Sequence, residues 1–284
     1  MEEAPVLRWT EQGEARSARW RSERGAPPPA NVVVVDDRVS ADEAYGLAAQ
    51  GVGLLWRGDF HNARQLLTAM AHRADRPPRK AARPEATSSA DAFQRERQLR
   101  AQRARTLGML LIPVEAGYRI ALRRAPDLRE ACVEAWGPPD EDACVVSLRE
   151  LQGVVGAHEW GRKGVELPLP GLRVHPHYGV FAPIRSEYVD LVAKAPLPAA
   201  LAATPLAFDV GTGTGVLAAV LARRGVPRII ATDLDARALE CARDNVLRLG
   251  IAKQVEVVRE DLFPDERAAL AVCNPPWLPA RPSS

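Results

Sequence analysis

The sequence predicts an α/β fold: a doubly wound, mostly parallel sheet in the C-terminal part of the chain, after a smaller N-terminal domain of helical and mixed structure. Three observations support this prediction. From residue 206, apolar runs of about five residues alternate with helical segments of roughly 10–14 residues, the pattern of parallel strands joined by helical crossovers. A glycine-rich stretch, 209–215, follows the first apolar run and opens a helix. The length of 284 residues suits two domains.

The C-terminal elements follow one another in a regular order. Strands are predicted at 206–210, 228–232, 255–258 and 269–273, and helices at 215–224 and 236–249. Before them we expect a short strand at 172–175, a helix at 187–194, and an Ala- and Pro-rich connector. We therefore assign 171–284 to the sheet domain.

The N-terminal part is less regular. Residues 1–30 have mixed charge and end in a proline run, so we predict a mobile tail. Residues 31–170 are assigned to a substrate-recognition or auxiliary domain, with a Pro-, Arg- and Ser-rich linker at about 75–90. Within this domain we expect a strand at 31–37, helices at 40–51, 59–73 and 91–107, and a β-hairpin made of 110–114 and 118–122.

Charge excludes a protein that coats polyanions over its whole surface, because 38 basic residues are balanced by 36 acidic ones. Locally, ten Lys and Arg stand against four acids between His72 and Arg105. Two interpretations remain open for this stretch: a solvated helix face with its linker, or a surface that contacts phosphate. In the second interpretation the contacts would come from Arg95, Arg97, Arg100 and Arg103.

Other classes of protein lack support in the sequence. Cys132, Cys144, Cys241 and Cys273 show no Cys-x-x-Cys spacing, which argues against zinc and redox motifs and favours a reduced, cytoplasmic protein. His175 and His177 have no third ligand in view, so we predict no metal site. No stretch approaches the roughly 18–20 apolar residues of a membrane span, and the N-terminus has no apolar signal-peptide core.

The first chemical motif is Asp209-Val-Gly-Thr-Gly-Thr-Gly215. Glycines let the backbone turn sharply and approach a ligand without interference from Cβ. A nicotinamide dehydrogenase would show Gly-x-Gly-x-x-Gly/Ala, whereas here the third glycine comes one residue earlier. The acid before the turn would repel a pyrophosphate and favours a ligand with a cationic end. The cofactor-binding residues predicted from this motif are Asp209, Gly211, Thr212, Gly213 and Gly215.

Acids also follow the second and third predicted strands. Asp233, with Leu234 beside it, is placed to accept hydrogen bonds from ribose hydroxyls. Asp235 is predicted instead to cap the helix that begins at Ala236. Asp261, with Leu262, is placed to accept a hydrogen bond from an exocyclic adenine amine. Three acids in register across consecutive strand–helix units favour a nucleoside cofactor.

The fourth predicted strand leads into Asn274-Pro-Pro-Trp277. With this motif, 175–284 resembles the class I S-adenosylmethionine-dependent methyltransferases, and within them the Asn-Pro-Pro-aromatic group that methylates planar exocyclic nitrogens. The resemblance implies a Rossmann-like sheet, S-adenosyl-L-methionine as the cofactor, and an enzyme of the transferase class. It implies a catalytic role for Asn274, Pro275, Pro276 and Trp277, with Asn274 also beside the cofactor.

The residue types of this motif suit the chemistry. An amide or aromatic amine nitrogen is a poor nucleophile because its lone pair is delocalised. The Asn274 side-chain oxygen and the Pro275 carbonyl can each accept one of its N–H groups and aim the lone pair at the methyl group. Prolines at 275 and 276 fix φ, and Trp277 can stack on the flat substrate.

Upstream, 177–188 is similar to the segment before the cofactor motif in release-factor glutamine methyltransferases of the HemK type. This similarity implies that Arg185 and Glu187 line the cofactor pocket, although Ile184-Arg-Ser-Glu-Tyr188 departs from the usual pattern. The substrate stays open between a protein glutamine or asparagine amide and a nucleobase amine of RNA or DNA. A non-catalytic cofactor-binding or regulatory protein is the alternative from another class.

Family members continue the sheet with three further strands after the Asn-Pro-Pro-aromatic motif. Only seven residues follow Trp277, whereas three strands and their helices need on the order of 70 residues. We therefore expect the C-terminal domain to be incomplete in this sequence and the 284-residue chain to be poorly active alone.

Overall fold

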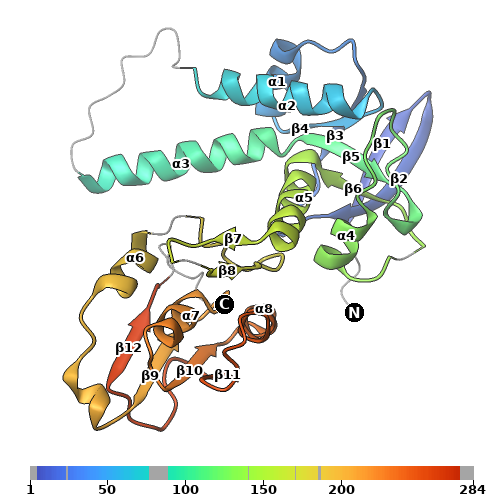
Figure 1. The fold of residues 1–284 in the computed structure, drawn as a ribbon. Helices are drawn as coiled ribbons and strands as arrows, with labels where there is room; N and C mark the ends of the chain where they lie inside the picture. Colours follow the sequence, from blue (N-terminus) through green and yellow to red (C-terminus); the bar gives the residue numbers. More distant parts are fainter. Residues whose placement is uncertain are drawn as a thin grey trace. The chain divides into compact units, whose positions relative to one another are not determined.

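The computed structural model describes residues 5–23, 25–76, 89–139, 141–169, 171–184 and 187–275. The chain divides into two compact units, Met1–Val155 and Gly156–Ser284, which are described separately below (Figure 1). The division falls inside helix α5 (Leu148–Lys163), whereas the sequence suggested a boundary after residue 170. A helix that runs through the division has no composition change to mark it, which is why a boundary based on composition falls later.

The N-terminal unit is built on a six-stranded sheet in the order β1-β2-β6-β5-β4-β3. Its strands are β1 (Val6–Glu11), β2 (Glu14–Arg21), β3 (Asn31–Val35), β4 (Val52–Trp56), β5 (Leu110–Val114) and β6 (Cys144–Ser147). The pairs β3/β4, β4/β5 and β2/β6 are parallel, while β1/β2 and β5/β6 are antiparallel.

The prediction of a mobile tail over residues 1–30 is wrong for 6–21, which form β1 and β2. Gln12 and Gly13 turn the chain with φ of 53° and 84°, as a tight hairpin requires. Leu7 and Trp20 are buried against β4, β5 and β6. Trp20 is the only large apolar residue of β2, which contains three arginines. The alternation of apolar and polar residues that marks a half-buried strand is therefore weak in this part of the sequence.

The described helices of this unit are α1 (Ala41–Ala49), α2 (Phe60–Ala74), α3 (Ser89–Leu107), α4 (Arg129–Trp136) and the first part of α5, with a 3₁₀ turn η1 (Ala116–Tyr118). Ser40 caps α1, because its side chain accepts a hydrogen bond from the N–H of Glu43 at 3.2 Å. The helix predicted at 59–73 is α2, and its apolar face is buried, with Met70 at 0% exposure. Most of the predicted linker, 77–88, lies outside the described residues.

The predicted hairpin over 110–122 is wrong in its second half. β5 forms as expected, but 116–118 is the turn η1, in which Gly117 and Tyr118 have φ of 69° and 59°. Tyr118 is buried and packs edge-on against Trp136 with ring centroids 5.4 Å apart. The hydrogen bonds that a hairpin would have used are made instead between β5 and β6, which is far away in the sequence.

The C-terminal unit has the predicted parallel α/β sheet, with strand order β11-β10-β9-β12 and every pairing parallel. Its strands are β9 (Leu206–Val210), β10 (Arg228–Asp233), β11 (Val255–Arg259) and β12 (Leu270–Cys273). Its helices are α6 (Glu187–Lys194), α7 (Val216–Arg223) and α8 (Ala236–Arg248), with a 3₁₀ turn η2 (Ala199–Ala202). A small antiparallel pair, β7 (Val165–Glu166) and β8 (Arg173–Val174), precedes them.

The strand order and the core define where a ligand site would form. Helices α6, α7 and α8 all contribute to one apolar cluster on the sheet face that carries Ala207 and Ala231. The opposite face, with Phe208 and Ile230, packs with Val258 and Ala268. The strand order reverses between β9 and β12, and open α/β sheets bind ligands at the carboxyl ends of the strands beside such a reversal.

Candidate cofactor site at the carboxyl ends of the strands

The strand register brings the predicted motifs to one edge of the sheet. Val210 pairs with Thr232 on one side and with Cys273 on the other, and Asp233 pairs with Arg259. The segments that begin at 211, 234, 260 and 274 therefore leave the sheet next to one another. Sequence reasoning predicted these segments separately, and the parallel register places them in one row.

The glycine-rich turn adopts a backbone that favours glycine at alternate positions. Gly211, Gly213 and Gly215 have φ of 67°, 55° and 77°. Among the described residues, apart from the glycine itself and its two neighbours in the chain, no atom lies within 4 Å of the place where a Cβ would stand at Gly211 or Gly213. At Gly215 a Cβ would lie 3.5 Å from the Cα of Ala242 on α8. The first two glycines therefore have open space beside them, and the third allows α8 to approach.

Asp209 lies beneath this turn and is 1% exposed. Its Oδ2 accepts hydrogen bonds from the hydroxyl of Thr212 at 2.6 Å and from the N–H of Ala218, in the first turn of α7, at 2.9 Å. Burial is the main reason that the pKa of Asp209 is raised to about 6. The two hydrogen bonds lower this pKa, and the nearby Asp233 raises it. The carboxyl group thus ties the turn to the start of α7.

Asp233 holds the turn from the neighbouring strand. Its Oδ2 accepts from the N–H of Gly213 at 3.0 Å, and its Oδ1 accepts from the N–H of Asp235 at 3.0 Å. Because a carboxylate has about four acceptor positions, both oxygens can accept further bonds. The capping role predicted for Asp235 is confirmed: its side chain accepts from the N–H groups of Arg237 and Ala238.

Two large apolar side chains stand exposed beside these acids. Leu234 is 55% exposed and Leu262 is 58% exposed. Leu262 has φ of 69°, a left-handed conformation that is uncommon for leucine. Its carbonyl accepts a hydrogen bond from the hydroxyl of Thr232 at 2.9 Å, which fixes this turn to β10. Asp261, next to it, is exposed.

The fourth motif is described only in part. Asn274 follows β12 directly and is half-buried, and Pro275 is exposed. Since Cys273 pairs with Val210, Asn274 leaves the sheet beside Gly211. Pro276 and Trp277, and Arg185 of the upstream segment, lie outside the described residues. The catalytic and cofactor-binding roles assigned to these positions stay predictions.

Asn245 is a site residue that sequence reasoning missed. It is 1% exposed on α8, and its amide donates to the carbonyls of Thr214 at 3.0 Å and His175 at 3.1 Å. Its side-chain oxygen accepts from the N–H of His175 at 2.7 Å. The signal available in the sequence is an amide on the helix face shared by Cys241 and Ala242, where a buried polar group needs partners.

Tyr188 is a second residue that was missed. It lies on α6, packs against the cluster around Ala207, and is half-buried. Burial and the carboxylate of Asp209 together raise the pKa of Tyr188 to about 12, so the phenol stays protonated near neutral pH. No pattern in the sequence connects Tyr188 with Asp209, because the two approach only through the packing of α6.

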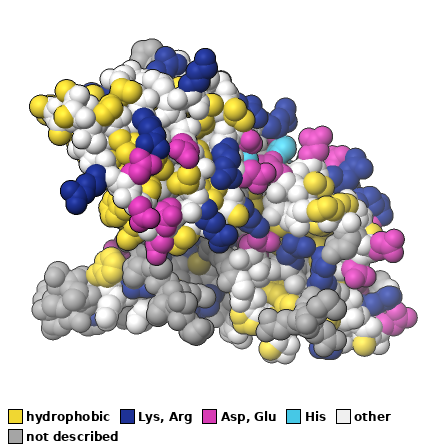
Figure 2. Space-filling view, turned by 90° about the horizontal axis from the view of Figure 1, so that it is seen from below, with side chains coloured by type: hydrophobic (Ala, Val, Ile, Leu, Met, Phe, Trp, Pro, Cys, Tyr) yellow, Lys and Arg dark blue, Asp and Glu magenta, His cyan; other side chains and the backbone are white. Residues whose placement is uncertain are grey.

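The arginines predicted to contact phosphate are partly engaged within the protein. Arg100 forms an ion pair with Glu96, and Arg103 donates from Nε to Asp75 at 2.8 Å. On the face that Figure 2 shows, Lys and Arg side chains are interspersed with Asp and Glu. Phosphate binding by α3 stays a prediction.

Among the described residues, no group of three or more His, Cys, Asp or Glu is placed to hold a metal ion, and no helix is long and apolar enough to cross a membrane.

Comparison with known proteins finds methyltransferases that are similar in sequence to the part of the chain that forms this edge. The family model of ribosomal protein L11 methyltransferase (PrmA) matches residues 197–275, which include the glycine-rich turn, Asp233, Asp235 and Asn274. The C-terminal unit is thus similar in sequence to a methyltransferase domain, and this similarity supports an enzyme of that class with S-adenosylmethionine as its cofactor.

Individual relatives differ in what their names say they modify. A ribosomal protein L11 methyltransferase of Pelotomaculum thermopropionicum is 45% identical over 69 residues, which are 24% of this chain and 22% of the relative. A release factor glutamine methyltransferase of Cereibacter sphaeroides is 43% identical over 75 residues, 25% of this chain and 27% of the relative. A tRNA1(Val) (adenine(37)-N6)-methyltransferase of Bacteroides thetaiotaomicron is 39% identical over 76 residues, 25% of this chain and 32% of the relative.

The similarity is confined to one part of each protein. The chain spans only about a fifth to a third of the length of these relatives. Among solved structures, a SAM-dependent methyltransferase from Thiobacillus denitrificans in complex with S-adenosyl-L-homocysteine is 27% identical, with a TM-score of 0.26, over 30% of this chain and 34% of that one. The N-terminal unit lies outside the match to the family model.

Proposed function

We propose that this chain is an S-adenosylmethionine-dependent N-methyltransferase that acts on a planar exocyclic nitrogen. One observation carries the proposal: the parallel register brings the open glycine turn, Asp233 and Asn274 to one edge of the sheet, beside the reversal of strand order. The sequence similarity of 197–275 to methyltransferases supports it.

The residues at this edge suit the cofactor. The open space at Gly211 and Gly213 lets the backbone approach a ligand. Asp233 has acceptor capacity left for ribose hydroxyls, and the exposed Leu234 and Leu262 offer apolar surface to a flat adenine ring. Once bound, the cofactor supplies an electrophilic methyl group on a good leaving group.

The role of the chain is then to orient the acceptor nitrogen. In our proposal the side-chain oxygen of Asn274 and the carbonyl of Pro275 each accept one N–H of the substrate, which favours charge build-up on that nitrogen and fixes its lone pair. The stacking role proposed for Trp277 concerns a residue outside those that the structure describes.

The substrate is proposed as a class with two members. One is a protein glutamine or asparagine amide, and the other is a nucleobase amine. The named relatives include enzymes for a ribosomal protein, a release factor glutamine and a tRNA adenine, and both members present the same planar nitrogen to Asn274. We also propose a cytoplasmic location, following the cysteine pattern.

The cofactor proposal is tested by calorimetric titration of S-adenosylhomocysteine into the full chain, with NAD⁺ as the competing nucleotide. An Asp233→Asn variant is expected to bind at least about tenfold more weakly, because a charge-assisted acceptor is lost. Asp235→Asn is the matched control, because asparagine also caps helices, and it should stay within about twofold. Absence of wild-type binding at about 1 mM ligand would overturn the proposal.

The reaction is tested by transfer of a tritiated methyl group from S-adenosylmethionine into cell extract, followed by separate protease and nuclease digestion. Label released only by nuclease excludes the protein amide, and label released only by protease excludes the nucleobase. Cofactor binding without transfer to either class fits both the non-catalytic, regulatory alternative and the weak activity that we expect of this chain.

A further inference from the structure

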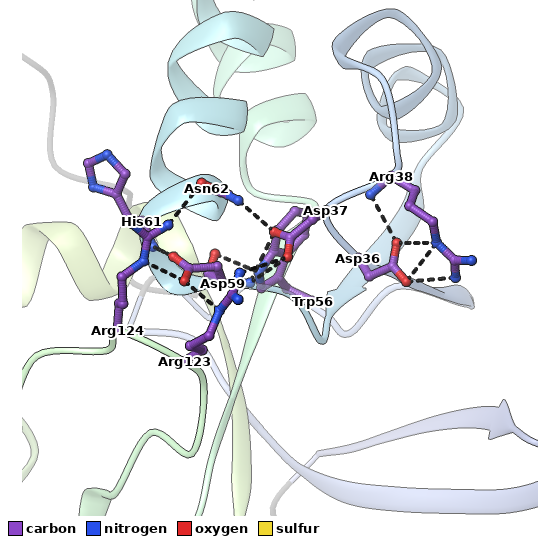
Figure 3. Close-up of polar contacts among 9 residues, drawn as sticks. All are labelled: Asp36, Asp37, Arg38, Trp56, Asp59, His61, Asn62, Arg123 and Arg124. Carbon is purple, nitrogen blue, oxygen red and sulfur yellow. Dashed lines mark hydrogen bonds and ion pairs between the residues drawn. The ribbon is translucent and has the colours of Figure 1, made fainter.

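A cluster of charged side chains in the N-terminal unit lies at the carboxyl ends of the parallel strands β3 and β4 (Figure 3). Asp37 follows β3, and Asp59 follows β4 and caps α2 by accepting from the N–H of His61 at 2.9 Å. Arg123 and Arg124 come from the segment after η1 and meet at Asp59. The cluster thus occupies an edge at which α/β sheets bind ligands.

One buried oxygen holds both arginines. The Asp59 side chain has no exposed surface, and its Oδ2 accepts from Nε of Arg123 at 2.9 Å and from Nε of Arg124 at 2.5 Å. The arginine side chains themselves are 72% and 58% exposed. Asp59 therefore anchors one edge of each guanidinium group and leaves much of each cationic group in solvent.

The Nη2 atoms of the two arginines have long contacts within the cluster. Nη2 of Arg123 lies 3.7 Å from Oδ2 of Asp37, and Nη2 of Arg124 donates to the amide oxygen of Asn62 at 3.4 Å. A good charge-assisted bond is shorter, about 2.7–2.9 Å. Both groups thus keep capacity to donate to a stronger acceptor.

The backbone accepts local strain to place these groups. Arg124 has φ of 56°, a left-handed conformation that normally favours glycine. At Gly58, a Cβ would lie 2.6 Å from Oδ1 of Asp37, so only glycine lets Asp37 approach and accept from the N–H of Asp59 at 3.0 Å. An arginine at a position better suited to glycine indicates that its side chain is needed there.

Two guanidinium groups that share one carboxylate oxygen lie within a few ångströms of each other, and their like charges repel. An anion placed between their outer nitrogen atoms would relieve the repulsion and receive bidentate donors, the arrangement by which arginine recognises phosphate. We propose that Arg123 and Arg124 form a phosphate-binding site that takes a phosphodiester of single-stranded nucleic acid.

The exposure of the site points to a polymer. An enclosed site with several buried donors would suit a free nucleotide, whereas this pair presents two exposed guanidinium groups at an open edge. Such a site gains useful affinity when a strand adds further contacts along its backbone. The proposal does not rest on methyl transfer, because the site lies in the N-terminal unit and can be tested by binding alone.

The test is fluorescence anisotropy of a labelled single-stranded RNA of roughly 15 nucleotides with the full chain, at salt concentrations from about 50 to 200 mM. In the variant Arg123→Gln/Arg124→Gln, the affinity at low salt is expected to fall about tenfold. The slope of log K against log salt should become shallower by about 0.7, because the pair contacts one phosphate.

The matched control is Arg16→Gln/Arg129→Gln, which removes the same charge from the same unit. These arginines are 58% and 64% exposed, and each is paired with a carboxylate two residues away, Glu14 or Asp127. The control is expected to stay within about twofold of wild type, with an unchanged slope.

Two outcomes overturn the proposal: equal losses in the test and control pairs, or no wild-type binding at low salt. If the double variant does not fold, Arg123→Gln alone keeps Arg124 on Asp59. It should weaken RNA binding at low salt by about threefold, and an unchanged affinity would also refute the site.

Discussion

Replacing Asp209 with asparagine is expected to change how the stability of the C-terminal unit depends on pH. Asp209 is buried, and its pKa is raised from 3.8 to about 6. Because the pKa in the folded state lies above the unfolded value, the folded protein holds the proton more tightly. Ionisation therefore removes stability as the pH rises from about 4 to about 6, and the loss persists above that range.

The size of the effect follows from the shift. One pKa unit corresponds to about 1.4 kcal/mol, so ionised Asp209 lowers the free energy of unfolding by about 3 kcal/mol relative to the protonated form. About half of this loss, roughly 1.4 kcal/mol, falls between pH 5 and pH 8. An asparagine has a similar shape, can accept from Thr212 and Ala218, and does not titrate.

Hydrogen exchange of the β9 and β10 amides, measured by mass spectrometry, reads the stability of this unit. From pH 5 to pH 8, the protection of Asp209→Asn relative to wild type should rise about tenfold, after correction for intrinsic exchange rates. If the ratio of the protection factors of the variant and the wild type is the same at both pH values, Asp209 does not carry a buried charge at pH 8 and the reasoning fails.

Three further substitutions test the candidate cofactor site. Asn274→Ala is expected to abolish methyl transfer while the dissociation constant for S-adenosylhomocysteine, measured by calorimetry, changes only a few-fold; surviving turnover would refute the role of this residue. Gly213→Ala places a Cβ in the open space at a φ of 55°, so it should lower stability by about 1 kcal/mol and cofactor affinity by about tenfold. The control is Gly225→Ala, which has a φ of 84° and also faces open space. This control should lose stability but keep its cofactor affinity. Asn245→Leu leaves backbone groups of Thr214 and His175 without their partner, and urea unfolding should show a loss of about 1–3 kcal/mol; an unchanged midpoint would contradict the structure here.

The parts of the fold that were predicted correctly are those with local signals. The predicted strand at 206–210 has the same bounds as β9, and the helix predicted from 236 to 249 is α8 with one residue less. Each follows from apolar runs and caps that lie within a few residues of one another. The prediction of a parallel sheet then needs only the length of the connections.

The parts that were not predicted depend on contacts between distant segments. β2 pairs with β6, more than a hundred residues later, and the few apolar residues of β2 give no strong pattern of their own. Likewise, large apolar side chains stand at every second position of 118–122, as they would in a strand, but Tyr118 packs against Trp136 of α4 instead. Tertiary packing outweighs local propensity at both places.

The same distinction applies to the candidate site, where the sequence indicated the turn but not what holds it. Thr212 is fixed by its hydroxyl bond to Asp209 and by its N–H, which donates to the carbonyl of Thr232 at 2.8 Å. Gly213 donates to Asp233, and the carbonyl of Thr214 accepts from Asn245. A turn anchored at three successive residues from three elements keeps its shape without a ligand. Cofactor binding at this edge then has little backbone ordering to offset, so we expect affinity to depend on the exposed contacts at Asp233, Leu234 and Leu262 rather than on closure of the turn.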